Sequence, residues 1–310
     1  MSWDLRSPLR YPGAKRNIAP LIEKLLIDYN YTDRVFVEPC CGGASVSLYL
    51  LEQEVVSKVV LIDKDPWVAS FWKMLFFHNK HLLQDIQNVE VSVETWEAMK
   101  KKEPKTMREK ALYCFFFNRT CYSGILKGGM IGGRAQASKY KIDCRFNKNE
   151  LLARMELIAS RFSSKIKEVR VGSVFNVLER AELEEQEDLI YYIDPPYVQK
   201  GEKLYPHYFH KKEHLRLKQT LEELSRPWVL SYNDHPDVLD MYCSNASLRH
   251  ISLEVLHVAD RARPSKEWLI TNFPNLKAEQ VLNELIQWSE LEHLSADQQE
   301  TCTHIETGAL

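Results

Sequence analysis

The residues best suited to chemistry in this sequence are Asp194-Pro195-Pro196-Tyr197, which directly follow the apolar run 189–193. The Asp194 carboxylate accepts hydrogen bonds, and the Pro195 carbonyl is a second acceptor on a chain that proline makes rigid. The aromatic ring of Tyr197 comes next. Two acceptors beside a ring fit a planar group that carries an amine. We therefore expect these four residues to be catalytic, with Tyr197 stacked on the substrate.

Residues 194–197 are expected to lie at the edge of a sheet. The run 189–193 is dense in β-formers and predicts a buried strand, which the two prolines end at once. The four residues should then project from the carboxyl edge of the sheet. Open α/β sheets bind their ligands at that edge.

A second ligand-binding pattern lies upstream. A predicted strand over 34–38 leads into Gly42-Gly43 and then into a predicted helix over 46–51. Glycines in such a turn let the backbone approach a ligand. The next predicted strand ends at Asp63, about twenty residues after the glycines, where a carboxylate can bind a ribose. Asp65 is instead expected to cap a helix that begins near Pro66.

The remaining patterns complete an α/β fold. Residues 147–150 resemble a capping box at the start of a helix with one apolar face. Strands are predicted over 228–231 and 251–255, and 268–270 is expected to return as an antiparallel partner of 251–255. The fold class is therefore a Rossmann-like, doubly wound, mostly parallel sheet with an antiparallel final strand. A smaller, mostly helical domain should accompany it.

Composition sets the outer limits. The chain has 310 residues, is 45% hydrophobic, and can bury one large core. Its seven cysteines include no Cys-x-x-Cys pair, which favours free thiols in a reducing cytoplasm and argues against a zinc or other metal site. Neither a signal peptide nor an apolar run of membrane-spanning length is present. We expect a cytoplasmic protein that has no membrane partner and can act as a monomer.

Five stretches of the sequence, in one order, resemble the motifs of the Dam-like, α-group DNA adenine methyltransferases. They are 10–15, 36–43, 61–63, 117–124 and 194–197. Residues 230–234 and 267–272 are similar to the last strands of that family. The resemblance therefore covers nearly all of the chain.

The resemblance implies S-adenosylmethionine as the methyl donor and a flipped adenine as the acceptor. Residues implied to bind the donor are Tyr11, Lys15, Glu38, Pro39, Cys40, Gly42, Gly43, Asp63, Ser173 and Asp194. Asp63 would hold the ribose hydroxyls, and Asp194 would face both donor and base. Ser173 stands where the family often has an acid, so a contact usually made by a carboxylate falls to its hydroxyl or is absent.

Double-stranded DNA is the implied partner. The formal net charge of the chain is −2, but residues 127–170 hold eleven Lys and Arg against four Asp and Glu. This basic segment is equally consistent with a surface that faces DNA phosphates and with an ordinary solvated face. The glycine-rich loop 124–134 is expected to read DNA, with Met130 or Ile131 as a wedge, or else to close over the donor. The DNA contacts we expect are Arg10, Asn118, Arg119, Tyr122, Ser123, Arg134, Gln136, Lys139 and Lys141.

These patterns predict three segments. Residues 1–69 and 166–288 form the catalytic domain, 70–165 an inserted target-recognition domain, and 289–310 a polar tail. The expected function is site-specific methylation of an adenine amine, as in restriction-modification systems. Two alternatives stay open: methylation of RNA or of a protein glutamine on the same fold, and a catalytically silent DNA-binding regulator.

Overall fold

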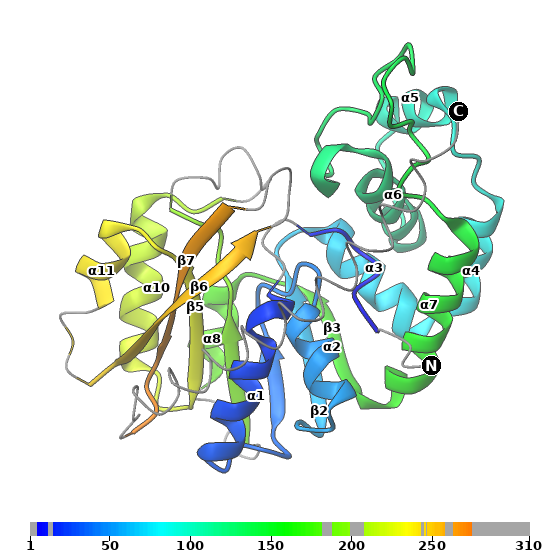
Figure 1. Ribbon diagram of the computed structural model, residues 1–310. Coiled ribbons are helices and arrows are strands. Elements are labelled where there is room, and N and C mark those ends of the chain that lie inside the picture. Colours follow the sequence, from blue (N-terminus) through cyan, green and yellow to red (C-terminus); the bar gives the residue numbers. More distant parts are fainter. Residues whose placement is uncertain are drawn as a thin grey trace, which may run out of the picture.

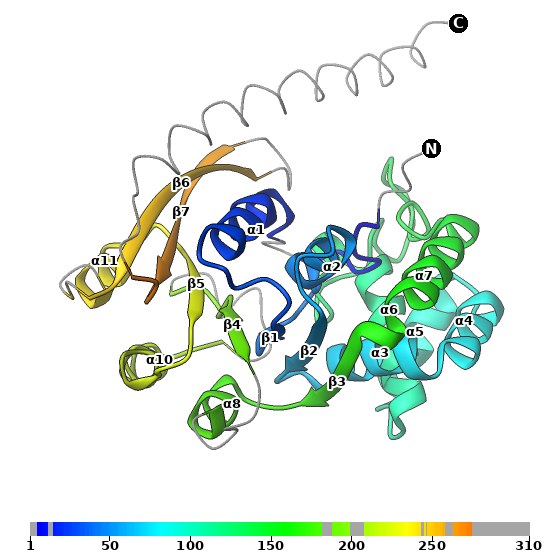
Figure 2. The same ribbon diagram turned by 90° about the horizontal axis from the view of Figure 1, so that it is seen from below.

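A seven-stranded sheet forms the centre of the computed structural model, which describes residues 5–11, 15–181, 188–198, 208–242, 245, 247–257 and 263–274. The strand order is β3-β2-β1-β4-β5-β7-β6, and all seven strands are labelled in the second of the two ribbon views (Figure 1, Figure 2). The strands are β1 (Val35–Glu38), β2 (Lys58–Asp63), β3 (Ile166–Val171), β4 (Leu189–Ile193), β5 (Trp228–Asn233), β6 (Arg249–His257) and β7 (Arg263–Thr271). The expected tail 289–310 and the segment 275–288 lie outside the described residues.

The pairing confirms the predicted fold class. Strands β1 to β5 pair in parallel, whereas β7 runs antiparallel to both of its neighbours, β5 and β6. The expected pairing of 268–270 with 251–255 is also confirmed, since Leu269 lies opposite Ile251. Because β7 runs backwards, residues in its middle reach the edge at which the parallel strands end.

Helices cover both faces of the sheet (Figure 2). Alternate residues of one strand join different cores, as Phe36 packs in the cluster that includes α1 and α2, and Val37 in the cluster that includes α8 and α10. Both faces are therefore apolar, which explains the nearly continuous hydrophobic runs of β1, β2 and β4. The helices are α1 (Ala19–Asp28), α2 (Ser45–Glu52), α3 (Pro66–Phe77), α4 (Asn79–Asn88), α5 (Val93–Lys101), α6 (Met107–Thr120), α7 (Lys148–Phe162), α8 (Val174–Ala181), α10 (Lys211–Glu223) and α11 (Pro236–Tyr242), with short 3-10 turns at Arg16–Ile18, Tyr122–Gly124 and Ser163–Lys165.

Local signals in the sequence set where two of these helices begin. Asp65 accepts a hydrogen bond from the Trp67 backbone N–H at 2.8 Å and so caps α3, as predicted. Asn147 caps α7 by accepting from the Glu150 N–H, which confirms the predicted start of the helix, and its amide donates to the Glu150 carboxylate at 3.1 Å. Both caps satisfy N–H groups that the first turn of a helix leaves without intrahelical partners.

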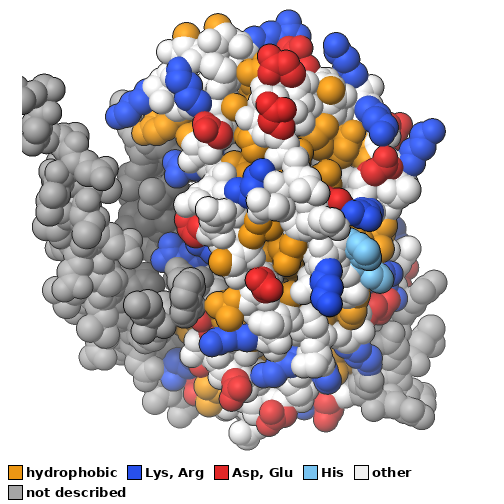
Figure 3. Space-filling view, turned by 90° about the vertical axis from the view of Figure 1, so that its right-hand side faces the viewer, with side chains coloured by type: hydrophobic (Ala, Val, Ile, Leu, Met, Phe, Trp, Pro, Cys, Tyr) orange, Lys and Arg blue, Asp and Glu red, His pale blue; other side chains and the backbone are white. Residues whose placement is uncertain are grey.

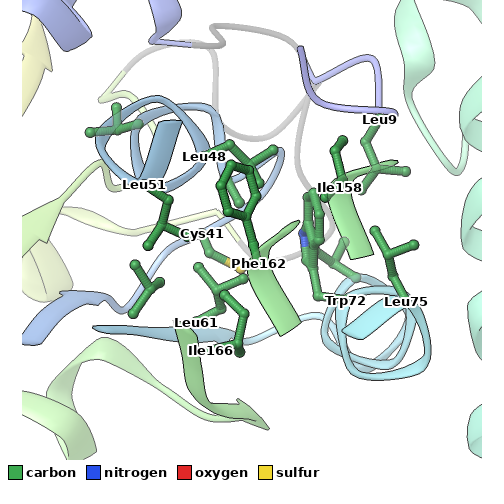
Figure 4. Close-up of a cluster of buried hydrophobic side chains, with 14 of the residues drawn as sticks. Leu9, Cys41, Leu48, Leu51, Leu61, Trp72, Leu75, Ile158, Phe162 and Ile166 are labelled. Carbon is green, nitrogen blue, oxygen red and sulfur yellow. The ribbon is translucent and has the colours of Figure 1, made fainter. Parts of the chain in front are cut away.

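The helices α4 to α7 lie beyond the β3 edge of the sheet and share its core (Figure 1, Figure 2). Figure 4 shows Leu61 of β2 and Leu51 of α2 in one cluster with Trp72 of α3 and Phe162 of α7. The helical part of the chain is thus packed directly on the sheet. Among the described residues, no helix combines the length and apolar character needed to cross a membrane.

Candidate active site

A cavity of about 800 Å³, its open mouth included, lies at the carboxyl ends of β1, β2, β3 and β4. The strand order reverses between β1 and β4, and ligands of open α/β sheets bind at such a reversal. All ten residues expected to contact the donor line this cavity, namely Tyr11, Lys15, Glu38, Pro39, Cys40, Gly42, Gly43, Asp63, Ser173 and Asp194. The fold therefore gathers residues that are up to 183 positions apart in the sequence.

The glycine turn after β1 forms the floor of the cavity. Gly42 has a φ of +44°, and its carbonyl accepts a hydrogen bond from the Trp72 indole at 2.8 Å. A Cβ on Gly42 would lie 2.6 Å from a ring carbon of Tyr11. Both the backbone conformation and the contact with Tyr11 require glycine here.

Two buried carboxylates line the cavity beside this turn. Asp63 accepts from the backbone N–H groups of Gly42 and Asp65, each at 2.8 Å, so it also holds the turn in place. Glu38 accepts from the Ser47 hydroxyl. Burial raises the pKa of Asp63 to about 7 and the pKa of Glu38 to about 8, because low-dielectric surroundings disfavour the charged form.

Asp194 follows β4 and lines the same cavity. Its Oδ1 accepts a hydrogen bond from the Ser231 hydroxyl at 2.9 Å and lies 3.3 Å from the Lys15 ammonium. The Ser231 hydroxyl is itself bonded to the Tyr192 hydroxyl at 2.9 Å. One carboxylate oxygen is therefore fixed by the protein. Pro195 is buried, and Pro196 lines the cavity.

Tyr197 is arranged differently from what the sequence suggested. Its side chain is 9% exposed, and its hydroxyl donates to Glu267 Oε1 at 2.9 Å. The Lys15 ammonium donates to the Tyr197 hydroxyl and lies 4.7 Å from the ring centroid. In this conformation the ring is engaged inside the protein, so stacking on a base requires the ring or its neighbours to shift.

Sequence reasoning missed Ser231 and Glu267 as members of this site. Glu267 is 1% exposed and lies 3.3 Å from Lys15 through its Oε1. A signal was present, because Glu267 directly precedes the apolar run 268–270, and an acid in a buried strand needs a buried partner. The partner comes from the other end of the chain, which the sequence alone does not reveal.

Asn118 and Arg119 were predicted to contact DNA, but both are buried, out of reach of a phosphate. Their side chains have a structural role instead. Asn118 is buried, accepts from the Arg10 N–H at 2.7 Å, and donates to the carbonyls of Arg10 and Gly124 at 2.8 and 3.0 Å. Arg119 is also buried and donates to the Pro8 carbonyl. The two side chains tie the N-terminal segment to the end of α6. Arg10, another of the expected DNA contacts, is half-buried.

Replacing Asn118 by alanine should lower the free energy of unfolding by about 2–4 kcal/mol, because it removes hydrogen bonds to buried backbone groups. Urea unfolding followed by circular dichroism measures the loss. Asn149→Ala, at an exposed position of α7, is the control and should change stability by less than about 0.5 kcal/mol. Equal losses in the two variants would contradict the structural role of Asn118.

The loop 124–134 is packed more closely than its composition suggested. Met130 and Ile131 are buried, and Met130 forms an isolated β-bridge with Cys121, so neither is displayed as a wedge. The Gln136 amide accepts from the Ile142 N–H at 2.7 Å and donates to the Ile131 carbonyl at 2.9 Å. The Gln136 side chain therefore stabilises the loop through these hydrogen bonds. Its amide groups are engaged within the protein and are not available to a base.

The other expected DNA contacts lie at the surface. Tyr122, Ser123, Arg134, Lys139 and Lys141 are exposed. Arg134 forms an ion pair with Glu97 at 2.7 Å, and Lys141 donates to the Gln136 carbonyl. On the side of the molecule seen in Figure 3, Lys and Arg alternate with Asp and Glu, so this face carries mixed charge and not a field of one sign.

Comparison with known proteins identifies a family for this chain. The sequence matches the family of D12 class N6 adenine-specific DNA methyltransferases over residues 11–260. No curated protein shows significant sequence similarity to the chain.

Solved structures similar to this chain share little sequence with it. A precorrin 8W decarboxylase from Methanobacterium thermoautotrophicum has 10% identity and a TM-score of 0.33, with 81% of this chain and 88% of that chain covered. The methyltransferase domain of a bacterial CtHen1-CN also has 10% identity, with a TM-score of 0.34 and coverage of 83% and 99%. The family match spans four fifths of the chain and includes the cavity and Asp194, and on that ground the chain belongs to the D12 class of N6 adenine-specific DNA methyltransferases.

Proposed function

We propose that this adenine-specific DNA methyltransferase takes the methyl group from S-adenosylmethionine and transfers it to the exocyclic amine of an adenine flipped out of duplex DNA. The observation that carries the proposal is the position of Asp194, with one carboxylate oxygen fixed by Ser231 and Lys15, on the wall of a cavity that also holds Asp63 and Glu38. An acceptor for an amine on the wall of such a cavity supports the proposal.

The residues of the cavity fit such a donor. Gly42 and Gly43 leave room for close approach to the backbone, and Asp63 offers carboxylate oxygens to ribose hydroxyls. Glu38 supplies negative charge for the amino acid part. When bound, the donor supplies a methyl group activated by its sulfonium charge. Ser173 and Phe209 also line the cavity and would contact the adenine ring of the donor.

The protein groups act on the acceptor amine. The free oxygen of Asp194 and the Pro195 carbonyl accept its two N–H bonds, which localises the nitrogen lone pair for attack on the methyl carbon. The bond from sulfur to that carbon breaks as the new N–C bond forms, and the electron pair stays on sulfur. The nitrogen then loses one proton to Asp194 or to water. Catalysis thus rests on orientation and hydrogen bonding.

The helical part of the chain, within residues 70–165, would provide target recognition. Its exposed side chains Tyr122, Arg134, Lys139 and Lys141 are the proposed DNA contacts, together with Ser123 and Arg10. Cytoplasmic location, a monomeric state and membership of a restriction-modification system stay predictions. The sequence of residues 200–210 favours a loop that closes on the substrate, and most of this segment lies outside the described residues.

The proposed function is tested by incubating the protein with methyl-labelled donor and duplex DNA, RNA or a protein substrate, followed by nucleoside and amino acid analysis. N6-methyladenine in DNA is the expected product. Label in RNA or in glutamine would favour the related methyltransferase activities instead. Binding of DNA without binding of the donor in calorimetry would favour a silent regulator.

Donor affinity should increase with pH between 6 and 8.5, by about tenfold. Burial raises the pKa of Asp63 to about 7 and that of Glu38 to about 8, so both acids are protonated at the lower pH and ionised carboxylates bind the cationic donor better. The folded protein holds these protons more tightly than the unfolded chain. The unliganded protein should therefore lose stability as the pH rises through the same range.

Titration calorimetry in buffers of different ionisation enthalpy measures both the affinity and the protons released on binding. Proton release near pH 7 is expected. Asp63→Asn and Glu38→Gln should each flatten the pH dependence. An affinity that is constant or falls with pH in the unaltered protein would contradict the assignment of these acids to the donor site.

A further inference from the structure

A buried ion-pair cluster connects β7 to the Asp194 side chain. Glu267 lies on β7 opposite Asn233, at the carboxyl end of β5. Its Oε1 lies 3.3 Å from the Lys15 ammonium and accepts from the Tyr197 hydroxyl at 2.9 Å. The same ammonium lies 3.3 Å from Asp194 Oδ1. Lys15 therefore lies between two carboxylates, and both lie at the edge of the sheet where the cavity opens.

The antiparallel direction of β7 explains why Glu267 reaches this edge. In a parallel strand, a residue with four strand residues after it would lie well below the carboxyl edge. In β7 the same position lies level with the carboxyl end of β5, opposite Asn233. The acid is 1% exposed, and burial of a carboxylate is costly unless it is paired. Lys15 and Tyr197 meet that requirement for Oε1.

The contacts on Asp194 converge on a single oxygen. Ser231 donates to Oδ1 at 2.9 Å, and Lys15 approaches Oδ1 as well. Within the described residues, Oδ2 accepts no hydrogen bond, and the Asp194 side chain is 22% exposed at the cavity. The carboxylate is therefore held from one side and left open on the other, as an acceptor for a substrate amine requires.

The ammonium of Lys15 could also compete with the substrate amine, since both are donors to Asp194. A second carboxylate on the ammonium limits that competition. With Glu267 ionised, Lys15 is shared and stays at Oδ1. With Glu267 neutral, the attraction of Lys15 for Asp194 is undivided, and the ammonium is drawn further onto the carboxylate that the amine must reach.

We propose that Glu267 is a positioning residue for methyl transfer. It holds the Lys15 ammonium and the Tyr197 hydroxyl so that Asp194 is fixed through Oδ1 and keeps Oδ2 for the amine. This inference rests on the proposed function for its catalytic meaning. Glu267 does not itself contact donor or base.

Glu267→Gln is the sharpest test, because it keeps the size of the side chain and an acceptor for Tyr197 but removes the charge. The single-turnover rate of methyl transfer should fall about 10- to 30-fold, while the donor dissociation constant changes less than about threefold. Lys266→Gln, at the exposed neighbouring position on β7, is the matched control and should leave both values unchanged. A rate for Glu267→Gln equal to that of the control would overturn the proposal.

The pH profile separates positioning from a merely structural role. Burial raises the pKa of Asp194, the Lys15 ammonium opposes this, and the Glu267 charge adds to the increase. Removal of that charge should move the acidic limb of the rate profile to lower pH. Among the described residues, the other titratable groups that interact with Asp194 are Glu38, Cys40, Tyr192 and Tyr232, and none of them is altered. An unshifted acidic limb would overturn the proposal.

A measurement without turnover distinguishes failure of this inference from failure of the proposed function. Carbon-13 NMR of labelled aspartate, with the Asp194 signal assigned by Asp194→Asn, gives its carboxyl pKa directly. A lower pKa of Asp194 in Glu267→Gln supports the coupling, and an unchanged pKa overturns it, whether or not the protein methylates DNA. Should Glu267→Gln fail to fold, Lys15→Met combined with Glu267→Gln removes both charges, and the same titration should then show a higher pKa of Asp194 than in the unaltered protein.

Discussion

Replacement of Asp194 by alanine should lower the single-turnover rate of adenine methylation by about 10³-fold, because it removes the acceptor that holds the amine in the transition state. The fold should persist. Lys15 keeps Glu267 as a partner, and Ser231 keeps its bond to the Tyr192 hydroxyl. The rate of Asp194→Asn should fall almost as far, since the amide keeps one acceptor but loses the charge.

The rate is measured by rapid mixing of the protein–donor complex with duplex DNA and counting of labelled N6-methyladenine. Asp188→Ala is the matched control. Asp188 lies at the opposite end of the same strand, where its exposed carboxylate pairs only with Arg34 at the surface among the described residues. Its loss should leave the rate within about twofold of the unaltered protein. A folded Asp194→Ala variant with a rate near that of the control would show that the amine is held elsewhere.

Gly42→Ala should weaken donor binding by about 100-fold, which corresponds to about 2.7 kcal/mol. A methyl group at this position would lie 2.6 Å from a ring carbon of Tyr11, which lines the cavity. The ring must move, and the backbone N–H that Gly42 donates to Asp63 moves with the turn. The residues expected to bind the ribose and the amino acid part of the donor are therefore displaced together.

Gly133→Ala controls for backbone strain alone. Gly133 also has a positive φ, of +65°, but an added Cβ would have no atom within 4 Å. Both variants should lose about 1–2 kcal/mol of stability from the left-handed conformation. Only Gly42→Ala should lose donor affinity in calorimetry. Equal donor affinity in the two variants would mean that the glycine turn does not contact the donor.

Patterns of short range were read correctly from the sequence. The strands at 35–38, 58–63 and 189–193 and the helix caps at Asp65 and Asn147 depend on residues within a few positions of one another. Hydrophobic periodicity, proline and capping side chains act over that distance, so the sequence suffices to predict them. The gathering of the ten cavity residues followed from the family resemblance and from the rule that parallel strands end at one edge.

Errors arose where a polar residue was judged by its type alone. Asn118, Arg119 and Gln136 carry side chains that often bind DNA, yet in this fold they bond to backbone groups of the protein. Buried backbone groups need partners, and these side chains supply them. Composition gives the chemical type of a residue but not its exposure.

The sequence by itself determined the parallel sheet with its antiparallel strand, the family, and the chemical types present at the site. Tertiary structure alone decided the partners: Lys15 with Asp194 and Glu267, Ser231 with Asp194, and Tyr197 with Glu267. These contacts join residues between 37 and 252 positions apart, brought together by the strand order and by the reversed direction of β7. Ion pairs and hydrogen bonds act over a few ångströms in space, and no spacing along the chain encodes which distant groups will come that close.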